Sequence, residues 1–335
     1  MYTHPAYKDL IGLGPFQPVI DEHGSHVNVI LVNRMFLEEQ HEVLFHKYKN
    51  DILFLGIMSF EAFPYPSPNP YSVQFPHDKY LDMFPGWLNM YREDSSSTTP
   101  MFGPNVKVLQ MSQSDFSLPE IQYDEEVEQG LHEKKYDFTY SMSDLDLSTG
   151  GQCNSWGSHA KNWTFVRDYA LDVMCGELNM TGVLLVTKDF SGKTCDIPPS
   201  CHGKMIQTTF LPQDQVYNYM RQSRFLFLPQ IYDASPRVAT QALTFNIPLL
   251  MNKNIVGGWK YINENTGEFF HDITDLRDSI HRLYSNMDNY KPRDYVLNNY
   301  GNQNAGKKLH EFITANFNDR VDLPPESELL IPVFN

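Results

Sequence analysis

One stretch of the chain combines a carboxylate, a helix start and a buried strand in an order that suits phosphate chemistry. Residues 225–228 form an apolar run of strand length, and Asp233 lies in the loop that follows. Ser235 and Pro236 are typical of a helix N-cap and first turn, so a helix is predicted over residues 235–244. Its amino end would present unpaired N–H groups and a partial positive charge to a ligand. The stretch therefore predicts a site for a diphosphate group.

The elements that position this stretch alternate along the chain. Strands are predicted at residues 27–32, 52–58, 136–142, 182–186, 205–210, 225–228 and 247–251, and helices at 36–50, 163–173, 213–222, 235–244, 273–287 and 309–317. Prolines, serines and aromatic residues between positions 64 and 119 predict long loops there. Short apolar strands separated by helices imply parallel sheets covered on both faces, and such sheets bind ligands at the carboxyl ends of their strands.

The length of 335 residues favours two α/β domains. An acidic stretch at residues 124–128 precedes the strand at 136–142, so the boundary is predicted near residue 133. We expect a reduced first domain over 1–133, a second over 134–320 that the helix at 309–317 completes, and a tail over 321–335 that returns to the first domain. The predicted fold class is α/β, with two Rossmann-like domains facing a cleft.

Composition excludes several classes of partner. The formal net charge of −15 opposes binding to nucleic acid or anionic lipid, and no apolar run is long enough to span a membrane. The first residues lack the pattern of a secretory leader, so we expect a cytoplasmic protein. The four cysteines lack paired spacing and are interpreted as reduced thiols: Cys153, Cys175, Cys195 and Cys201. The glycosylation tripeptides at Asn162 and Asn179 are interpreted as chance occurrences.

The order of these features resembles the group-1 glycosyltransferases, a large family with the GT-B fold. Members carry two acidic residues separated by seven others, then a helix of small residues and a strand similar to Ile-Pro-Leu. Asp233 and Gln241 hold the two positions, and Pro236, Val238 and Ala242 match the family's residues around them.

Further segments extend this resemblance over roughly residues 136 to 320. The loop with Gly257 and Gly258 looks like the family's Gly-Gly loop, and residues 264–270 look like its Thr-Gly-hydrophobic turn. Lys161 stands where the family has a basic turn whose lysine grips the diphosphate.

The resemblance implies a retaining, metal-independent transferase that moves a hexose or pentose from a UDP or GDP sugar to a glycan or glycoprotein acceptor. Asp233 would bind hydroxyls of the donor sugar, Gln241 the ribose, and Lys161 the diphosphate. Asp233 and Arg237 would be the catalytic residues, with Arg237 supplying positive charge. The nucleotide site would also include Ser235, Pro236, Gly257 and Gly258. The resemblance implies no metal ion or other cofactor.

The chain departs from the family pattern in three places. The second acidic position is the amide Gln241, and Ser143 and Asp144 follow the strand at 136–142 where an arginine is expected. The first domain has no evident glycine loop or catalytic histidine. Its aromatic-rich style is similar to glycosyltransferases encoded by large viruses of algae, which would place the protein in a host cytoplasm.

Two other functions fit parts of the sequence. Asp144 and Asp146 could be the D-x-D motif of a metal-dependent GT-A glycosyltransferase, in which two carboxylates hold Mn²⁺ or Mg²⁺ against the diphosphate. Alternatively, Gln241 and the missing arginine fit a non-catalytic carbohydrate-binding or protein-binding module on a transferase scaffold. Metal dependence and turnover of a nucleotide sugar separate these hypotheses.

Each candidate residue also has a purely structural interpretation. Asp233 could cap its own loop, and the charges of Arg237 and Lys161 could simply face solvent. Gln241 could be an ordinary polar residue on a helix surface, and the two glycines could form only a turn.

Overall fold

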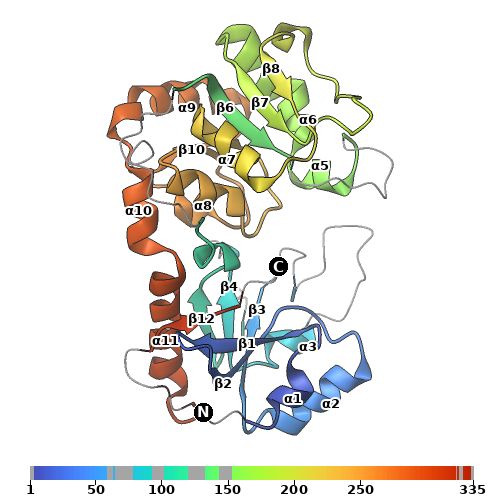
Figure 1. The fold of residues 1–335 in the computed structure, drawn as a ribbon, viewed down its shortest axis with the longest axis vertical. Helices are drawn as coiled ribbons and strands as arrows, with labels where there is room; N and C mark the ends of the chain where they lie inside the picture. Colours follow the sequence, from blue (N-terminus) through green and yellow to red (C-terminus); the bar gives the residue numbers. More distant parts are fainter. Residues whose placement is uncertain are drawn as a thin grey trace. The chain divides into compact units, whose positions relative to one another are not determined.

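The computed structural model describes residues 4–58, 63–64, 78–92, 102–119, 133–142, 153–321, 323 and 327–332. The chain forms two compact units, one of Met1–Leu118 with Asn299–Asn335 and one of Pro119–Asn298 (Figure 1). We call them unit 1 and unit 2.

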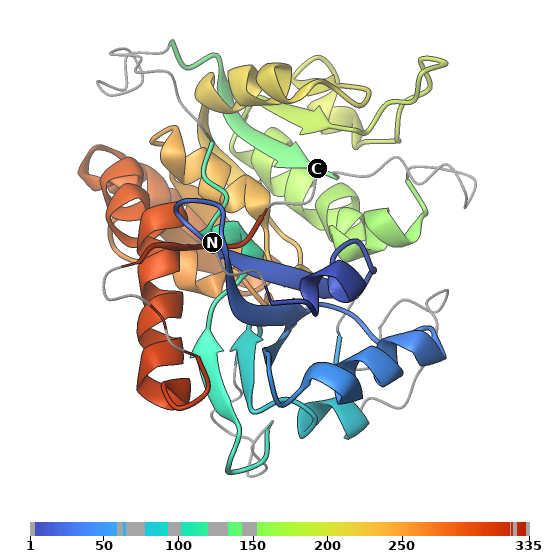
Figure 2. The same cartoon turned by 60° about the horizontal axis from the view of Figure 1, so that its bottom comes forward.

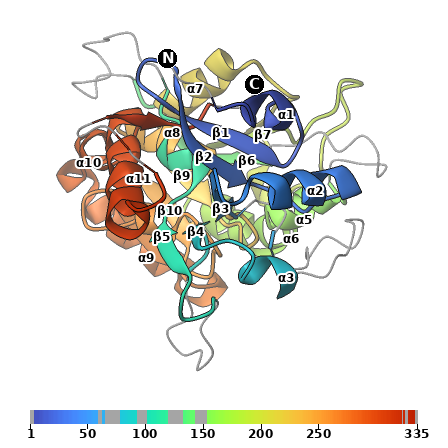
Figure 3. The same cartoon turned by 90° about the horizontal axis from the view of Figure 1, so that it is seen from below.

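Unit 1 is built on a six-stranded sheet in the order β12-β1-β2-β3-β4-β5. The strands are β1 (Phe16–Asp21), β2 (His26–Val32), β3 (Leu53–Ile57), β4 (Gly86–Asn89), β5 (Lys107–Gln110) and β12 (Leu329–Leu330). Strands β2 to β5 run parallel, whereas β1 is antiparallel to both of its neighbours. The helices are α1 (Tyr7–Leu10), α2 (Glu39–Tyr48), α3 (Asp78–Leu81) and α11 (Asn302–Phe317), and Figure 3 shows the parallel strands between α11 on one side and α2 and α3 on the other.

The prediction of long loops between residues 64 and 119 is wrong where β4 and β5 form. Each has only four residues, and β4 is buried along its whole length, so it lacks the alternation that identifies a half-buried strand. Two glycines allow its close packing. A Cβ on Gly56 of β3 would overlap the Trp87 ring, and one on Gly86 would come within 2.9 Å of the Phe317 ring.

Helix α11 belongs to unit 1, although its place in the chain predicted that it would complete the second domain. It packs beside β5 (Figure 2) and against β12. Gly306 lies so close to the Leu329 backbone that a side chain would overlap the Leu329 carbonyl oxygen. The tail then pairs with β1, through Ile20 with Leu330 and Asp21 with Leu329. Sequence order alone carries no signal for which sheet a terminal helix covers.

Unit 2 has an all-parallel sheet in the order β11-β10-β9-β6-β7-β8. Its strands are β6 (Tyr136–Ser141), β7 (Gly182–Leu185), β8 (Met205–Gln207), β9 (Ser223–Leu228), β10 (Leu249–Asn252) and β11 (Gly267–Phe270). Its helices are α5 (Trp156–Ala160), α6 (Trp163–Phe165), α7 (Gln213–Arg221), α8 (Arg237–Thr244), α9 (Ile273–Ser285) and α10 (Pro292–Asn299), and α6 continues into π-helical turns at Val166–Ala170 and Asp172–Glu177.

This strand order is that of a Rossmann-like sheet. The chain starts in the middle at β6 and builds β7 and β8 on one side, then crosses back to β9 and builds β10 and β11 on the other. The direction of winding therefore reverses between β6 and β9. In open parallel sheets such a reversal leaves a crevice at the carboxyl ends of the two strands, where ligands bind.

The sequence predictions for unit 2 are largely confirmed. Strands form at five of the five positions predicted within it, and helices follow at α6, α7, α8 and α9. The additional strand β11 was expected only as a turn, because Gly267-Glu-Phe-Phe is short and begins with a glycine whose φ is 148°. A side chain at Gly267 would overlap the Leu249 carbonyl oxygen of the neighbouring strand.

The interpretation of the four cysteines as reduced thiols is wrong in this structure. Cys153 pairs with Cys195, and Cys175 pairs with Cys201. The partners are 42 and 26 residues apart in sequence, so no local spacing pattern announces them. Both bridges tie the connection between β7 and β8 to the connection between β6 and β7, at the turn before α5 and at the π-helical turn Asp172–Glu177.

Candidate functional site

Two of the residues predicted to contact the donor meet at the reversal point of unit 2. Lys161, on the connection after β6, forms an ion pair through Nζ with Oδ2 of Asp233, on the loop after β9. The side chains are 17% and 11% exposed, so the pair is largely shielded from water. Both come from the carboxyl ends of the two central strands, which is where a ligand of this fold would bind.

Helix α5 presents Lys161. Ser155 caps the start of the helix, with its hydroxyl accepting from the Ser158 N–H at 3.2 Å. Lys161 is the C-cap, and its carbonyl accepts a hydrogen bond from the Tyr140 hydroxyl at 3.1 Å. Complete burial raises the pKa of Tyr140 well above its ordinary value, so the hydroxyl keeps the proton that it donates. Strand β6 thereby fixes the backbone from which the lysine extends.

Asn162 joins this turn to the end of β9. Its backbone is left-handed, with φ of 59°, a conformation that asparagine tolerates better than most residues. Its side-chain Nδ2 donates to the Pro229 carbonyl at 2.9 Å, and Nδ2 of Asn252 approaches the same oxygen at 3.4 Å. Sequence reasoning noted Asn162 only as part of a chance glycosylation tripeptide. Its positioning role has no signal short of the three-dimensional structure.

The loop of Asp233 is held by its own backbone and by the glycine loop. Oδ1 of Asp233 accepts from the Ser235 N–H at 3.1 Å, and the Asp233 carbonyl accepts from the Gly257 N–H at 3.0 Å. The predicted N-cap at Ser235 is wrong. Helix α8 begins at Arg237 with Pro236 as N-cap and no side-chain capping bond.

Gly257 and Gly258 pack directly against this loop. A Cβ on Gly257 would overlap the Ala234 carbonyl oxygen, and a Cβ on Gly258 would overlap the Pro236 ring. Gly258 also has a φ of 75°, in the left-handed region that favours glycine. The glycine pair is therefore required for close approach of two loops, and its turn geometry alone does not account for it. The glycine loop therefore packs against the backbone of the loop that carries Asp233.

Arg237 and Gln241 lie on α8 and not in the ion pair. Arg237 is exposed in the first turn of the helix, and Gln241 is half-buried one turn later. Among the described residues, neither side chain hydrogen-bonds to Lys161 or Asp233. The structure thus brings together Lys161, Asp233, Ser235 and the glycine loop, and leaves the other two along the helix that leads away from them.

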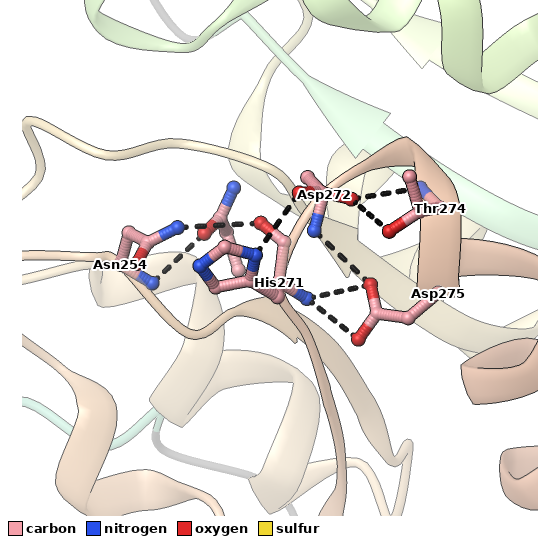
Figure 4. A network of polar contacts seen from close by, with 6 residues as sticks. Asn254, His271, Asp272, Thr274 and Asp275 are labelled. Atoms are coloured by element: carbon pink, nitrogen blue, oxygen red, sulfur yellow. Dashed lines mark hydrogen bonds and ion pairs between the residues drawn. The ribbon is translucent and has the colours of Figure 1, made fainter.

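A second polar network lies at the carboxyl ends of β10 and β11 (Figure 4). Nδ2 of Asn254 donates to the His271 carbonyl at 3.2 Å, and the His271 N–H donates to Oδ1 of Asp275 at 2.9 Å. Asp272 caps α9, and hydrogen bonds from the hydroxyl and N–H of Thr274 lower the pKa of its carboxyl group. The network fixes the start of α9 beside the sheet edge, and the capping pattern accounts for its carboxylates.

The structure does not test the alternative metal site. Asp144 and Asp146 lie outside the described residues, as does Ser143. In the described part of the chain, no three His, Cys, Asp or Glu side chains are grouped as metal ligands would be.

Comparison with known proteins defines the fold. No protein-family model matches the chain, and no curated protein sequence matches it. Sucrose-phosphate synthase from Thermosynechococcus elongatus matches with a TM-score of 0.53 at 12% identity, over 89% of this chain and 75% of that one. TarM matches with a TM-score of 0.53 at 8% identity, over 86% of this chain and 54% of that one. The chain has the GT-B fold.

The GtfA/B complex matches with a TM-score of 0.52 at 11% identity, over 85% of this chain and 57% of that one. The chain therefore spans little more than half the length of the TarM and GtfA/B chains. At these identities the GT-B match concerns the fold, and the chemistry has to be argued from the residues of the site.

Proposed function

We propose that this protein is a glycosyltransferase that moves a sugar from a nucleotide diphosphate sugar to a glycan or glycoprotein acceptor. The observation that carries the proposal is the Lys161–Asp233 pair at the reversal point between β6 and β9. A cation and a carboxylate side by side match the two charges that develop when a sugar leaves a diphosphate.

Breaking the bond between the anomeric carbon and the phosphate oxygen leaves negative charge on the diphosphate and positive charge on the sugar ring. Lys161 and the free N–H groups at the start of α8 would stabilise the diphosphate, with the exposed Arg237 adding charge. Asp233 would bind sugar hydroxyls and favour the positive ring. The opposite charges of the two side chains neutralise one another in this pair.

The finer parts of the proposal rest on the resemblance to group-1 glycosyltransferases. They are retention of configuration at the anomeric carbon, a UDP or GDP donor, Gln241 at the ribose and no need for a metal ion. An amide can donate and accept hydrogen bonds to a ribose diol, which supports Gln241 in that role.

The location of the protein is a separate part of the proposal. No helix among the described residues is long and apolar enough to cross a membrane. A cytoplasmic location stays a prediction, and the two disulfides count against it because such bonds persist mainly in oxidising compartments.

The test measures release of nucleotide diphosphate from UDP and GDP sugars, with and without EDTA. We expect release by the wild-type protein that EDTA leaves unchanged. Loss with EDTA, rescue by Mn²⁺ and equal loss in the Asp144→Asn, Asp146→Asn double variant would favour the GT-A site. Binding of nucleotide without any release, across a panel of acceptors, would favour the non-catalytic module.

A further inference from the structure

Three aromatic rings lie together immediately beside the Lys161–Asp233 pair. His159 stacks on Tyr232 with ring centroids 5.4 Å apart and an angle of 27°, and Trp156 approaches the two rings at 5.2 and 6.0 Å. We call these residues the aromatic platform. Trp156 and His159 come from α5, which presents Lys161, and Tyr232 directly precedes Asp233.

The platform is open to a ligand. Tyr232 is 41% exposed and His159 is exposed, while Trp156 is half-buried. Single exposed aromatic residues are ordinary on protein surfaces. Here three rings from two separate connections, those after β6 and β9, form one partly exposed aromatic cluster next to a shielded ion pair, in the part of the sheet where this fold binds ligands.

We propose that the aromatic platform is the subsite for the ring of the donor sugar, which stacks its apolar face on Tyr232 while Asp233 binds its hydroxyls. A sugar ring has C–H groups on its faces and hydroxyl groups around its rim. An aromatic face and a carboxylate on adjacent residues match these two features at once. The proposal deepens the proposed function and rests on it.

The nucleobase is the competing occupant, and the chain order argues against it. The ribose is assigned to Gln241, one turn along α8 from Arg237 and about 6 Å farther from the start of the helix. The base extends beyond the ribose. Along the chain Tyr232 directly precedes Asp233, the residue proposed to bind the sugar, whereas Gln241 follows Asp233 by eight residues, so we assign the platform to the sugar end of the donor.

The experiment compares binding of UDP-glucose and of UDP by calorimetry, with GDP-mannose and GDP as the second pair if the wild-type protein prefers guanine. The variants are Tyr232→Ala and His159→Ala, with Tyr232→Phe retaining the ring. Tyr169→Ala is the matched control, because Tyr169 is 53% exposed on the helical segment after Asn162 and is not part of the platform.

We expect Tyr232→Ala to weaken binding of the nucleotide sugar about tenfold and to change the affinity for the free nucleotide diphosphate by no more than about twofold. Tyr232→Phe should bind as the wild type does. Equal weakening of sugar and free diphosphate would assign the platform to the base and overturn the proposal, as would a Tyr232→Ala variant that behaves like Tyr169→Ala. A wild-type protein that binds no nucleotide would instead refute the proposed function itself.

Discussion

Asp233 uses its two carboxylate oxygens for different partners. Oδ2 pairs with Lys161, and Oδ1 accepts the Ser235 N–H. The second contact is the loop-capping role that the sequence also allowed, so the residue has a structural task in the free protein. A loop cap does not require the partly buried Lys161 as a second partner, and the proposed role of Asp233 in donor binding rests on that ion pair.

The Asp233→Asn substitution separates these tasks. The amide oxygen can still accept from Ser235, so we expect stability to change little. The lost charge no longer favours positive character on the sugar ring, so kcat should fall by on the order of 100-fold while the affinity for free nucleotide diphosphate is nearly unchanged. Steady-state kinetics and calorimetry on the same preparations give both values.

Lys161→Ala is the companion variant. The Lys161 charge would face phosphates that are present in both the donor and the free nucleotide diphosphate. Removing this charge should therefore weaken the binding of both ligands. If Asp233→Asn keeps normal turnover, the carboxylate charge is not needed for the reaction and the site assignment is wrong.

At this scale the sequence predicted Asp233 and Lys161 but not what holds them. The family pattern identifies the two residues, and the structure brings them together. Asn162 and Tyr140 were missed because their bonds run to backbone carbonyls far along the chain or across the sheet. Ser235 was assigned as a cap because local chemistry suggests it, but the helix begins later, at Arg237, with Pro236 as its N-cap.

The strands that were predicted and the strands that were missed differ in how they are buried. Five of the six strands of unit 2 lie between helices and were predicted. Three of the missed strands, β4, β5 and β11, have four residues each, and glycine begins two of them. Their stability comes from neighbouring strands and rings, such as Trp87 over Gly56, which no local pattern records.

The two disulfides were not predicted from the sequence. They lead to a prediction about the stability of the protein. Each closes a loop of 26 or 42 residues, which corresponds to about 3–4 kcal/mol of unfolding free energy in the chain-entropy model. We expect reduction to lower Tm by at least about 5 °C. Scanning calorimetry with and without reductant measures this change.

The matched controls are the paired variants Cys153→Ser with Cys195→Ser and Cys175→Ser with Cys201→Ser. The double substitution of Cys175 and Cys201 should lower Tm more than the other double substitution, because these two residues are fully buried in the core of unit 2. Both disulfides would be contradicted if the protein purified without reductant had four free thiols and if reductant left its Tm unchanged.

For the whole molecule, the length and the alternation of strands and helices predicted two α/β units, and the family resemblance implied the GT-B fold, but the path of the last segment was not predicted. The chain leaves unit 2 near Asn298 and returns to unit 1 through α11 and β12. Its helical pattern predicted a helix correctly. Which sheet it covers depends on Gly306 and Phe317 finding partners more than 20 residues away or in another strand.

The central claim is that the carboxyl ends of β6 and β9 bind a nucleotide diphosphate sugar. A crystal structure with the nucleotide diphosphate that binds most tightly, and with its sugar conjugate, tests this most directly. We predict the diphosphate at the first turn of α8 within hydrogen-bonding distance of Lys161 Nζ, and sugar hydroxyls on the Asp233 carboxylate. A diphosphate bound elsewhere on the chain, with Lys161 and Asp233 still paired and untouched by ligand, would contradict it.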